Sequence, residues 1–183
     1  GLSVDDIQVV SKHDTSTEAN DPNENKLHHL IQKKLGRKSG NPFFVHSQKA
    51  LLGHAKGGAG AWQAIAAIQM MLSGKIPGNP NLEDVDPKMR PYSTLLFSDQ
   101  TIELGEREIR AVLMTSLGFG HVGAATLFLH PDLALESLSP EVFQEYRLKR
   151  NKRERKHLQK SQQVLLGKKP LYYYLEFYQF ESP

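Results

Sequence analysis

Residues 7–17 read Ile7-Gln8-Val9-Val10-Ser11-Lys12-His13-Asp14-Thr15-Ser16-Thr17, and residues 20–24 read Asn20-Asp21-Pro22-Asn23-Glu24. The run from Ile7 to Val10 is short and rich in β-branched residues, which is typical of a buried strand. Asp21 is expected as the N-cap of a helix, with Pro22 in the first helical position and Glu24 completing a capping-box-like arrangement. The stretch therefore predicts a strand, a polar turn and a helix. It places His13 just beyond the carboxyl end of the strand, where α/β folds carry their sites.

The rest of the chain continues this alternation. The predicted helix has an apolar face of Leu27, Leu30, Ile31 and Leu35 and ends at Gly36. Strands are also expected from 42 to about 47–48 and at 95–97, 101–104, 111–116 and 124–130. Helices are expected at 57–72 and from 139 to about 166, a loop at 77–91 and a tight turn at 118–120. This order predicts an α/β fold with a mixed sheet.

Composition fits a soluble globular protein. The chain has 183 residues, of which 39% are hydrophobic and 23% charged, which is enough for a domain with a sizeable core. No apolar run is long enough to span a membrane, and the N-terminus lacks the pattern of a secretory signal, so we expect a cytoplasmic protein. There are no cysteines, which excludes a disulfide scaffold and a thiolate metal site.

The basic residues are concentrated near the C-terminal end. Eight of them lie between residues 147 and 160, namely Arg147, Lys149, Arg150, Lys152, Arg153, Arg155, Lys156 and Lys160. Such a run is usually the solvated face of a surface helix, and it also suits an anionic partner such as nucleic acid. We therefore expect a domain over residues 1–135 and a basic helical tail over residues 136–183. Within the tail, the aromatic residues 171–180 could pack as an arm on a neighbouring surface.

Two histidines are candidates for catalysis. His13 lies in a polar turn with Thr15 and Thr17, and a neutral imidazole can donate a hydrogen bond to a developing enolate or oxyanion. His54 precedes a glycine-rich helix start, which disfavours its protonated form, and Lys49 could hold the local geometry by pairing with a carboxylate such as Glu24. The alternatives are a turn histidine at His13 and a phosphate-binding loop at His54, although the loop lacks P-loop spacing.

Two further motifs can each be interpreted as purely structural or as functional. Glu24 could act as a capping residue, as a member of a polar network, or as both. Gly118-Phe119-Gly120 could be an ordinary turn, or could supply backbone N–H groups to an oxyanion hole with Phe119 as a movable gate. The remaining histidines have no trustworthy metal-ligand spacing, so no metal site is expected.

Taken together, these motifs resemble the C-terminal half of a β-ketoacyl synthase. The resemblance rests on His13-x-Thr15-x-Thr17, on Asp21 and Glu24, on Lys49 with Gly53-His54, and on Gly118-Phe119-Gly120. Ordinary members of this family carry glycine where this chain has Asp14 and Ser16. The variants found here look most like the synthase domain of type I, multifunctional fatty acid synthases, and the bacterial, actinomycete-like ones resemble it more than the fungal ones.

The resemblance implies a thiolase-like fold, in which two similar halves form an α-β-α-β-α layered core and this chain supplies the second half. His13 and His54 would then be the two catalytic histidines, with Lys49 also in the catalytic set. Glu24, Thr15, Thr17 and Asp21 would form the supporting network, and Phe119 with Gly118 and Gly120 would form the oxyanion hole and gate. One departure is that many members carry Asn shortly after the Gly-Phe-Gly turn, whereas Val122-Gly123 stand there in this chain.

The implied reaction is the decarboxylative Claisen condensation of malonyl-acyl carrier protein with an acyl group held as a thioester on cysteine. That cysteine would belong to the N-terminal half of the ketosynthase, outside this chain. Implied partners are this half, an acyl carrier protein domain and a second synthase domain in a homodimer within a larger oligomer. No cofactor would bind directly, because the phosphopantetheine of the carrier protein arrives as a substrate arm. The alternatives are an inactive half-domain serving as a scaffold or dimerisation element, and a basic nucleic-acid-binding module, which we do not favour.

Overall fold

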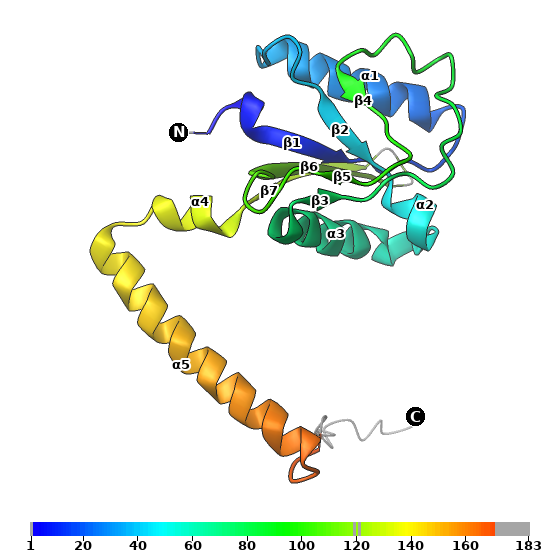
Figure 1. Ribbon diagram of the computed structural model, residues 1–183. Helices are drawn as coiled ribbons and strands as arrows, with labels where there is room; N and C mark the ends of the chain where they lie inside the picture. Colours follow the sequence, from blue (N-terminus) through cyan, green and yellow to red (C-terminus); the bar gives the residue numbers. More distant parts are fainter. Residues whose placement is uncertain (1, 119, 121, 171–183) are drawn as a thin grey trace, which may run out of the picture. The chain divides into compact units, whose positions relative to one another are not determined.

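The computed structural model describes residues 2–118, 120 and 122–170. The chain divides into two compact units, Gly1–Ala134 and Leu135–Pro183, which we treat separately. The first unit contains the predicted mixed sheet (Figure 1). Its strands are β1 (Ile7–Ser11), β2 (Phe43–His46), β4 (Leu95–Leu96), β6 (Ala111–Leu117) and β7 (Gly123–Leu129), arranged in the order β4-β2-β1-β6-β7.

The centre of this sheet is parallel. β1 pairs in parallel with both β2 and β6, and β2 pairs in parallel with β4, whereas β7 returns antiparallel to β6. A separate antiparallel pair joins β3 (Lys75–Ile76) to β5 (Ile102–Glu103). Because β1, β2 and β6 run the same way, their carboxyl ends meet at one edge of the sheet, which is the edge where α/β folds place their sites.

A helix covers each face of the sheet (Figure 1). On one side, α1 (Asn20–Lys34) lies over an apolar cluster that includes Val10, Phe43 and Leu113, with Ile31 packed against it. On the other side, α3 (Ala59–Ser73) buries Ala67, Met70 and Met71 against Val9 and Val112. The strands β1, β2, β6 and β7 therefore contribute to both apolar clusters, and the unit has three layers.

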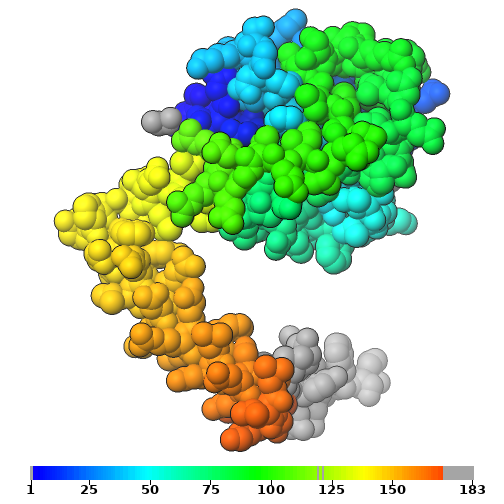
Figure 2. Space-filling view, viewed as in Figure 1, coloured from blue at the N-terminus to red at the C-terminus, as the bar shows by residue number. Residues whose placement is uncertain are grey.

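The space-filling view shows how much of one face is covered by irregular chain (Figure 2). The segment between β3 and β4, drawn in green, is the predicted loop, and it spreads over the visible surface of the first unit. Asn79 ties this segment to the sheet, because its side-chain amide donates to the carbonyl oxygens of Val45 at 3.1 Å and Ser98 at 3.0 Å.

Three local expectations were wrong. α1 begins at Asn20 after the cap residue Ala19, so Asp21 is not the N-cap and Glu24 does not close a capping box; the first backbone N–H is instead accepted by Thr17 Oγ1 at 3.2 Å. A short helix, α2 (Gln48–Leu52), and a 3-10 turn, η2 (Lys56–Gly58), precede α3 where no helix was expected. The helix α4 (Pro131–Glu136) follows β7, although Pro131 was expected only to end the strand.

The predicted apolar face of α1 is also wrong. Leu27 and Leu30 are each 41% exposed and Leu35 is 61% exposed, while the side chains that the helix buries are polar. These buried residues are Glu24, Asn25, His28 and Gln32. Of the predicted apolar face only Ile31 packs against the sheet, and the buried polar side chains find polar partners there: Glu24 and His28 contact Thr115 of β6, and Gln32 donates to the Thr94 carbonyl.

The second unit consists mainly of α5 (Pro140–Leu165), which matches the predicted long helix. Ser139 caps its N-terminus by accepting a hydrogen bond from the Val142 N–H at 3.4 Å, and none of its residues is buried. The predicted aromatic arm at residues 171–180 lies outside the described residues. No helix in the described part of the chain has the length and apolar character needed to cross a membrane.

Candidate active site

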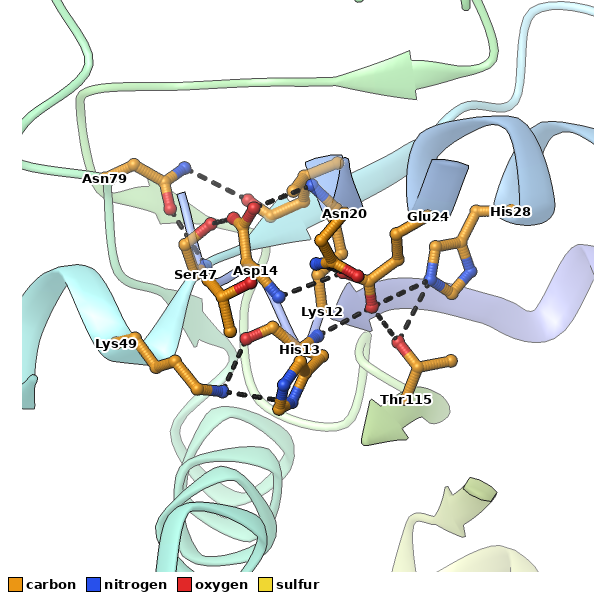
Figure 3. A network of polar contacts seen from close by, with 12 residues as sticks. Lys12, His13, Asp14, Asn20, Glu24, His28, Ser47, Lys49, Asn79 and Thr115 are labelled. Atoms are coloured by element: carbon orange, nitrogen blue, oxygen red, sulfur yellow. Dashed lines mark hydrogen bonds and ion pairs between the residues drawn. The ribbon is translucent and has the colours of Figure 1, made fainter. Parts of the chain in front are cut away.

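Three neighbouring strands deliver polar residues to the carboxyl edge of the sheet (Figure 3). His13 follows β1, Ser47 and Lys49 follow β2, and Thr115 lies near the end of β6. Glu24 reaches the same place from α1, with a fully buried side chain. The structure thus brings together residues that are as much as 102 positions apart in the sequence, from His13 to Thr115.

Glu24 organises the network as an acceptor of hydrogen bonds. Its Oε1 accepts from the backbone N–H of His13 at 2.7 Å and from the Thr115 hydroxyl at 2.5 Å, and its Oε2 accepts from the backbone N–H of Asp14 at 2.9 Å. Burial alone would raise the pKa of this carboxyl, but the nearby His28 ring and the hydrogen bonds from Thr115 and the two backbone N–H groups lower it to about 2. Glu24 is therefore a fixed anion that holds the turn carrying His13.

Lys49 supports His13 directly. The ammonium donates to the backbone carbonyl of His13, and its Nζ lies 3.5 Å from the ring Nδ1 of the same residue. The expected ion pair between Lys49 and Glu24 is not formed among the described contacts. Because an ammonium can only donate, His13 Nδ1 is an acceptor and the ring proton of the neutral imidazole resides on Nε2.

His54 lies beside His13 in the connection between α2 and α3. The two imidazole centroids are 5.6 Å apart and the rings meet edge to face at 87°. Gly53 ends α2 with a φ of 71°, a conformation that favours glycine, and so turns the chain into His54. His54 Nδ1 accepts the backbone N–H of Lys56 at 2.9 Å, which again leaves the proton of a neutral ring on Nε2.

The surroundings of His13 favour its neutral form. Burial and then the charge of Lys49 lower the pKa of His13, with the Glu24 carboxylate acting in the opposite direction. Burial also lowers the pKa of Lys49, although the carboxylates of Glu24 and Asp14 offset part of this effect. The site therefore favours an imidazole that can donate a hydrogen bond without carrying a charge.

Asp14 and Ser16 occupy positions where the backbone is left-handed. Their φ angles are 47° and 55°, which explains why glycine suits these positions in ordinary β-ketoacyl synthases. In this chain the Asp14 carboxylate accepts hydrogen bonds from Lys12 Nζ at 3.0 Å and from the Ser47 hydroxyl. Lys12 is only 1% exposed and Asp14 is partly exposed, so this half-buried ion pair helps to hold the turn in its left-handed conformation.

The remaining predicted residues of the network lie around this turn. The hydroxyl oxygens of Thr15 and Thr17 are 3.4 Å apart, and Thr17 also starts α1 as described above. Asp21 lies in the first turn of α1, where burial and the nearby Asp14 carboxylate raise its pKa. Gly118 donates its N–H to the carbonyl of Val122 at 2.7 Å, and Gly120 has a φ of 78°, as expected for residues of a turn. The proposed gate Phe119 lies outside the described residues.

Sequence reasoning missed several members of this network. Lys12, Ser47, Asn79, Gln63 and Thr115 were not singled out, and His28 was considered only as a metal ligand. One signal was available: His28 stands four residues after Glu24, so both lie on the same face of a helix. For the others, only the pairing of the strands brings them to the site.

A cavity of about 430 Å³ opens beside the turn. Thr15, Lys49 and His54 line it on one side, and residues of the segment between β3 and β4 line it on the other. Of the two candidate histidines, His54 lines this cavity, and the turn residues Asp14 to Ser16 that follow His13 line it as well.

Residues 1–83 match the family model of the beta-ketoacyl synthase C-terminal domain. The chain is 41% identical over 155 residues to the fatty acid synthase subunit alpha of Saccharomyces cerevisiae and 43% identical over 155 residues to that of Candida albicans. Each alignment covers 85% of this chain but only 8% of the relative. These relatives are fungal, so they do not bear out the preference for the bacterial branch.

Solved structures show the same fold. The ketosynthase FabY from P. aeruginosa has a TM-score of 0.73 at 23% identity, over 88% of this chain and 25% of that one. Ketosynthase twelve of the bacillaene polyketide synthase from Bacillus amyloliquefaciens has a TM-score of 0.64 at 21% identity, over 70% of this chain and 23% of that one. Residues 1–83 are thus similar to the C-terminal domain of beta-ketoacyl synthases, and the chain as a whole is similar to a small part of the alpha subunits of fungal fatty acid synthases.

Proposed function

We propose that this chain supplies the histidine half of a β-ketoacyl synthase site in fatty acid biosynthesis. The reaction is the decarboxylative Claisen condensation of malonyl-acyl carrier protein with an acyl group bound to a cysteine on the other half of the ketosynthase. The single observation that supports this best is the arrangement of His13 and His54. The two rings lie edge to face with a centroid separation of 5.6 Å, and each has Nδ1 occupied as an acceptor, so that Nε2–H is free to donate.

The chemistry needs two such donors. When the malonyl group loses carbon dioxide, the electron pair of the broken C–C bond moves onto the thioester oxygen as an enolate. Preorganised donors aimed at that oxygen typically lower the barrier by about 3 kcal/mol each. The enolate carbon then attacks the acyl thioester, a new C–C bond forms, and the cysteine leaves as a thiolate.

The supporting residues have distinct roles in this proposal. Lys49 and Glu24 hold His13, while Thr15, Thr17 and Asp21 shape the turn beside the cavity through which the phosphopantetheine arm enters. Gly118 and Gly120 would shape the turn that carries the gate Phe119, whose own backbone N–H would help to form the oxyanion hole, since the Gly118 N–H is already donated to the Val122 carbonyl. Phosphopantetheine acts here as part of the substrate, and no cofactor is assigned to the chain itself.

The exposed face of α3 supports the need for a second half. Trp62, Ile65, Ile68 and Leu72 are between 43% and 53% exposed and follow one another at helical spacing. Apolar side chains in such a stripe mark an interaction surface. We propose that the cysteine-bearing N-terminal half packs on this face. The completed domain would form a homodimer within a larger cytoplasmic fatty acid synthase that also holds the acyl carrier protein.

The test is the substitution His54→Ala in a complete ketosynthase that includes the cysteine half. We expect malonyl decarboxylation and condensation to fall about 100-fold or more, because one enolate donor is lost, while acylation of the cysteine stays largely intact. Decarboxylation is measured by release of labelled carbon dioxide, and loading by intact mass of the acyl-enzyme.

His157→Ala is the matched control, because His157 is an exposed histidine on α5. This variant should behave like the wild type in both assays. If His54→Ala released carbon dioxide at the wild-type rate, the role assigned to His54 would be wrong.

A further inference from the structure

A buried series of hydrogen bonds lies behind Glu24, and the mechanism above gives it no role. His28 is fully buried, and its Nε2 lies 3.2 Å from the Thr115 hydroxyl and 3.9 Å from Glu24 Oε1. Thr115 is 2% exposed, and its hydroxyl donates to Glu24 Oε1. Figure 3 shows His28, Thr115 and Glu24 converging from α1 and β6 on the same carboxylate oxygen.

The donor and acceptor in each of these hydrogen bonds follow from counting the available protons. A hydroxyl has a single hydrogen, and Thr115 gives it to Glu24, so Thr115 can receive a hydrogen bond only through its oxygen lone pairs. His28 Nε2 must then carry the proton and donate to the Thr115 oxygen. His28 Nδ1 is buried without a hydrogen-bond partner among the described residues, so Nε2 is the nitrogen through which this ring makes its hydrogen bond.

Thr115 also connects two sides of the site. Its side chain holds Glu24 and thereby the turn carrying His13, while its backbone carbonyl accepts from Gln63 Nε2 of α3 at 3.2 Å. The same amide nitrogen donates to the carbonyl of Lys12 at 2.8 Å, next to His13. Thr115 is therefore held from both faces of the sheet, three residues before the turn that starts at Gly118.

We propose that Thr115 is a positioning residue for the condensation, passing a hydrogen bond from His28 to Glu24 so that Glu24 fixes the backbone of His13. The inference rests on the proposed function, because it assigns Thr115 to the same enolate-stabilising site. Without the hydroxyl, Glu24 Oε1 would keep one backbone donor at this position, and the carboxylate could turn away from His13.

The experiment compares Thr115→Val with Thr115→Ser in the complete ketosynthase. Valine keeps the shape of threonine but removes the hydroxyl, whereas serine keeps the hydroxyl. We expect the valine variant to lose about tenfold in kcat of malonyl decarboxylation, as for the loss of one hydrogen bond to a charged group. The KM for malonyl-acyl carrier protein and the rate of cysteine acylation should stay within about twofold of the wild type, because neither uses Thr115. The serine variant should restore the wild-type kcat.

The outcomes separate this inference from the proposed function. If the wild type decarboxylates and His54→Ala does not, but valine and serine at position 115 have equal kcat, the positioning role of Thr115 is overturned while the proposed function stands. If His54→Ala is as active as the wild type, the proposed function itself fails. An equal loss in the valine and serine variants would likewise overturn the role of the hydroxyl.

A second pair of variants covers the case in which the valine variant does not fold. His28→Leu removes the donor at the far end of the chain, and His28→Gln keeps a side-chain N–H at a similar distance from the backbone. We expect the leucine variant to lower kcat without changing cysteine acylation, and the glutamine variant to be closer to the wild type. The reverse order would contradict the proposed direction of the hydrogen bonds.

Discussion

Glu24 both stabilises the fold and positions the turn that carries His13. Its carboxylate has no access to water, yet it stays ionised because its oxygens accept hydrogen bonds from His13, Asp14, Asn20 and Thr115. A buried anion is tolerated only when its acceptor capacity is filled in this way. Of the two roles that the sequence left open for Glu24, helix cap and member of a polar network, the structure contains the second, in which Glu24 anchors the turn carrying His13.

We predict that Glu24→Gln weakens the complete ketosynthase domain in a pH-dependent manner. The pKa of Glu24 is about 2 in the folded protein against an ordinary value of 4.5, so ionised Glu24 contributes on the order of 3 kcal/mol to the free energy of unfolding. Since the folded-state pKa is the lower one, this contribution is complete above pH 4.5 and is lost as the pH falls towards 2. In denaturant unfolding at pH 7, the free energy of unfolding of the variant should be much lower than that of the wild type.

The pH dependence of the difference in free energy of unfolding tests this prediction. The difference between the two proteins should narrow steadily as the pH falls from 4.5 towards 2. A difference that stayed constant over this range would mean that ionised Glu24 does not stabilise the fold. Glu18→Gln, at an exposed position just before α1, is the control for removing a carboxylate that is not buried, and this variant should unfold like the wild type at each pH.

At the scale of elements, the strands followed from the sequence more readily than the helices. β1, β2 and β6 are runs of apolar, often β-branched residues buried on both faces, and such runs can be recognised without knowing their neighbours. α5 was also predictable, because Ser139 and Pro140 mark its start. α2 was missed because it has only five residues, from Gln48 to Leu52, too few to show a period.

α1 was predicted with its faces reversed, and the cause is physical. Periodicity identifies an apolar stripe but cannot show which stripe meets the sheet. In α1 the polar stripe is buried, because His28 and Glu24 find partners on β6 and Gln32 Nε2 donates to the Thr94 carbonyl at 2.8 Å. The candidate histidines His13 and His54 were found from their motifs, whereas the network beneath them depends on contacts that only the folded sheet creates.

We predict that Ile65→Asp prevents the N-terminal half of the ketosynthase from packing on α3. Ile65 is half exposed in the middle of the apolar stripe, and a buried, unpaired carboxylate at this position should weaken association on the order of 100-fold. Co-purification of the two halves, expressed as separate chains, measures this effect.

Ile65→Leu is the matched control, since it keeps an apolar side chain of the same volume. It should leave co-purification unchanged. If the aspartate variant associated as well as the leucine variant, α3 would not be the surface that receives the N-terminal half.

At the scale of the whole molecule, the absence of cysteine from all 183 residues makes a direct prediction. The chain alone should accept no acyl group and should form no β-ketoacyl product. Addition of a cysteine-bearing N-terminal half should restore both reactions, because the nucleophile and the enolate donors then share one site. Intact mass spectrometry after incubation with acyl-carrier protein measures the loading, and condensation by the isolated chain would refute the assignment.

The α5 unit differs in charge from the first unit. Its helix carries eight basic residues between Arg147 and Lys160, with Glu154 as the single acidic residue among them. Two exposed ion pairs, between Lys149 and Glu145 and between Arg150 and Glu154, link side chains four residues apart along the helix. Such pairs contribute about 0.3–0.5 kcal/mol each, so the helix depends on its caps and its intrinsic propensity more than on these contacts.

The ion pair between Lys12 and Asp14 is asymmetric, because the lysine side chain is buried whereas the carboxylate is 16% exposed beside the cavity. Replacing Asp14 with glycine would relieve the backbone but leave a buried ammonium without this counterion. Replacing Lys12 would leave a carboxylate that water can still reach. We therefore expect glycine at position 14 to be found together with a replacement of the lysine, whereas Asp14 tolerates the loss of Lys12 better.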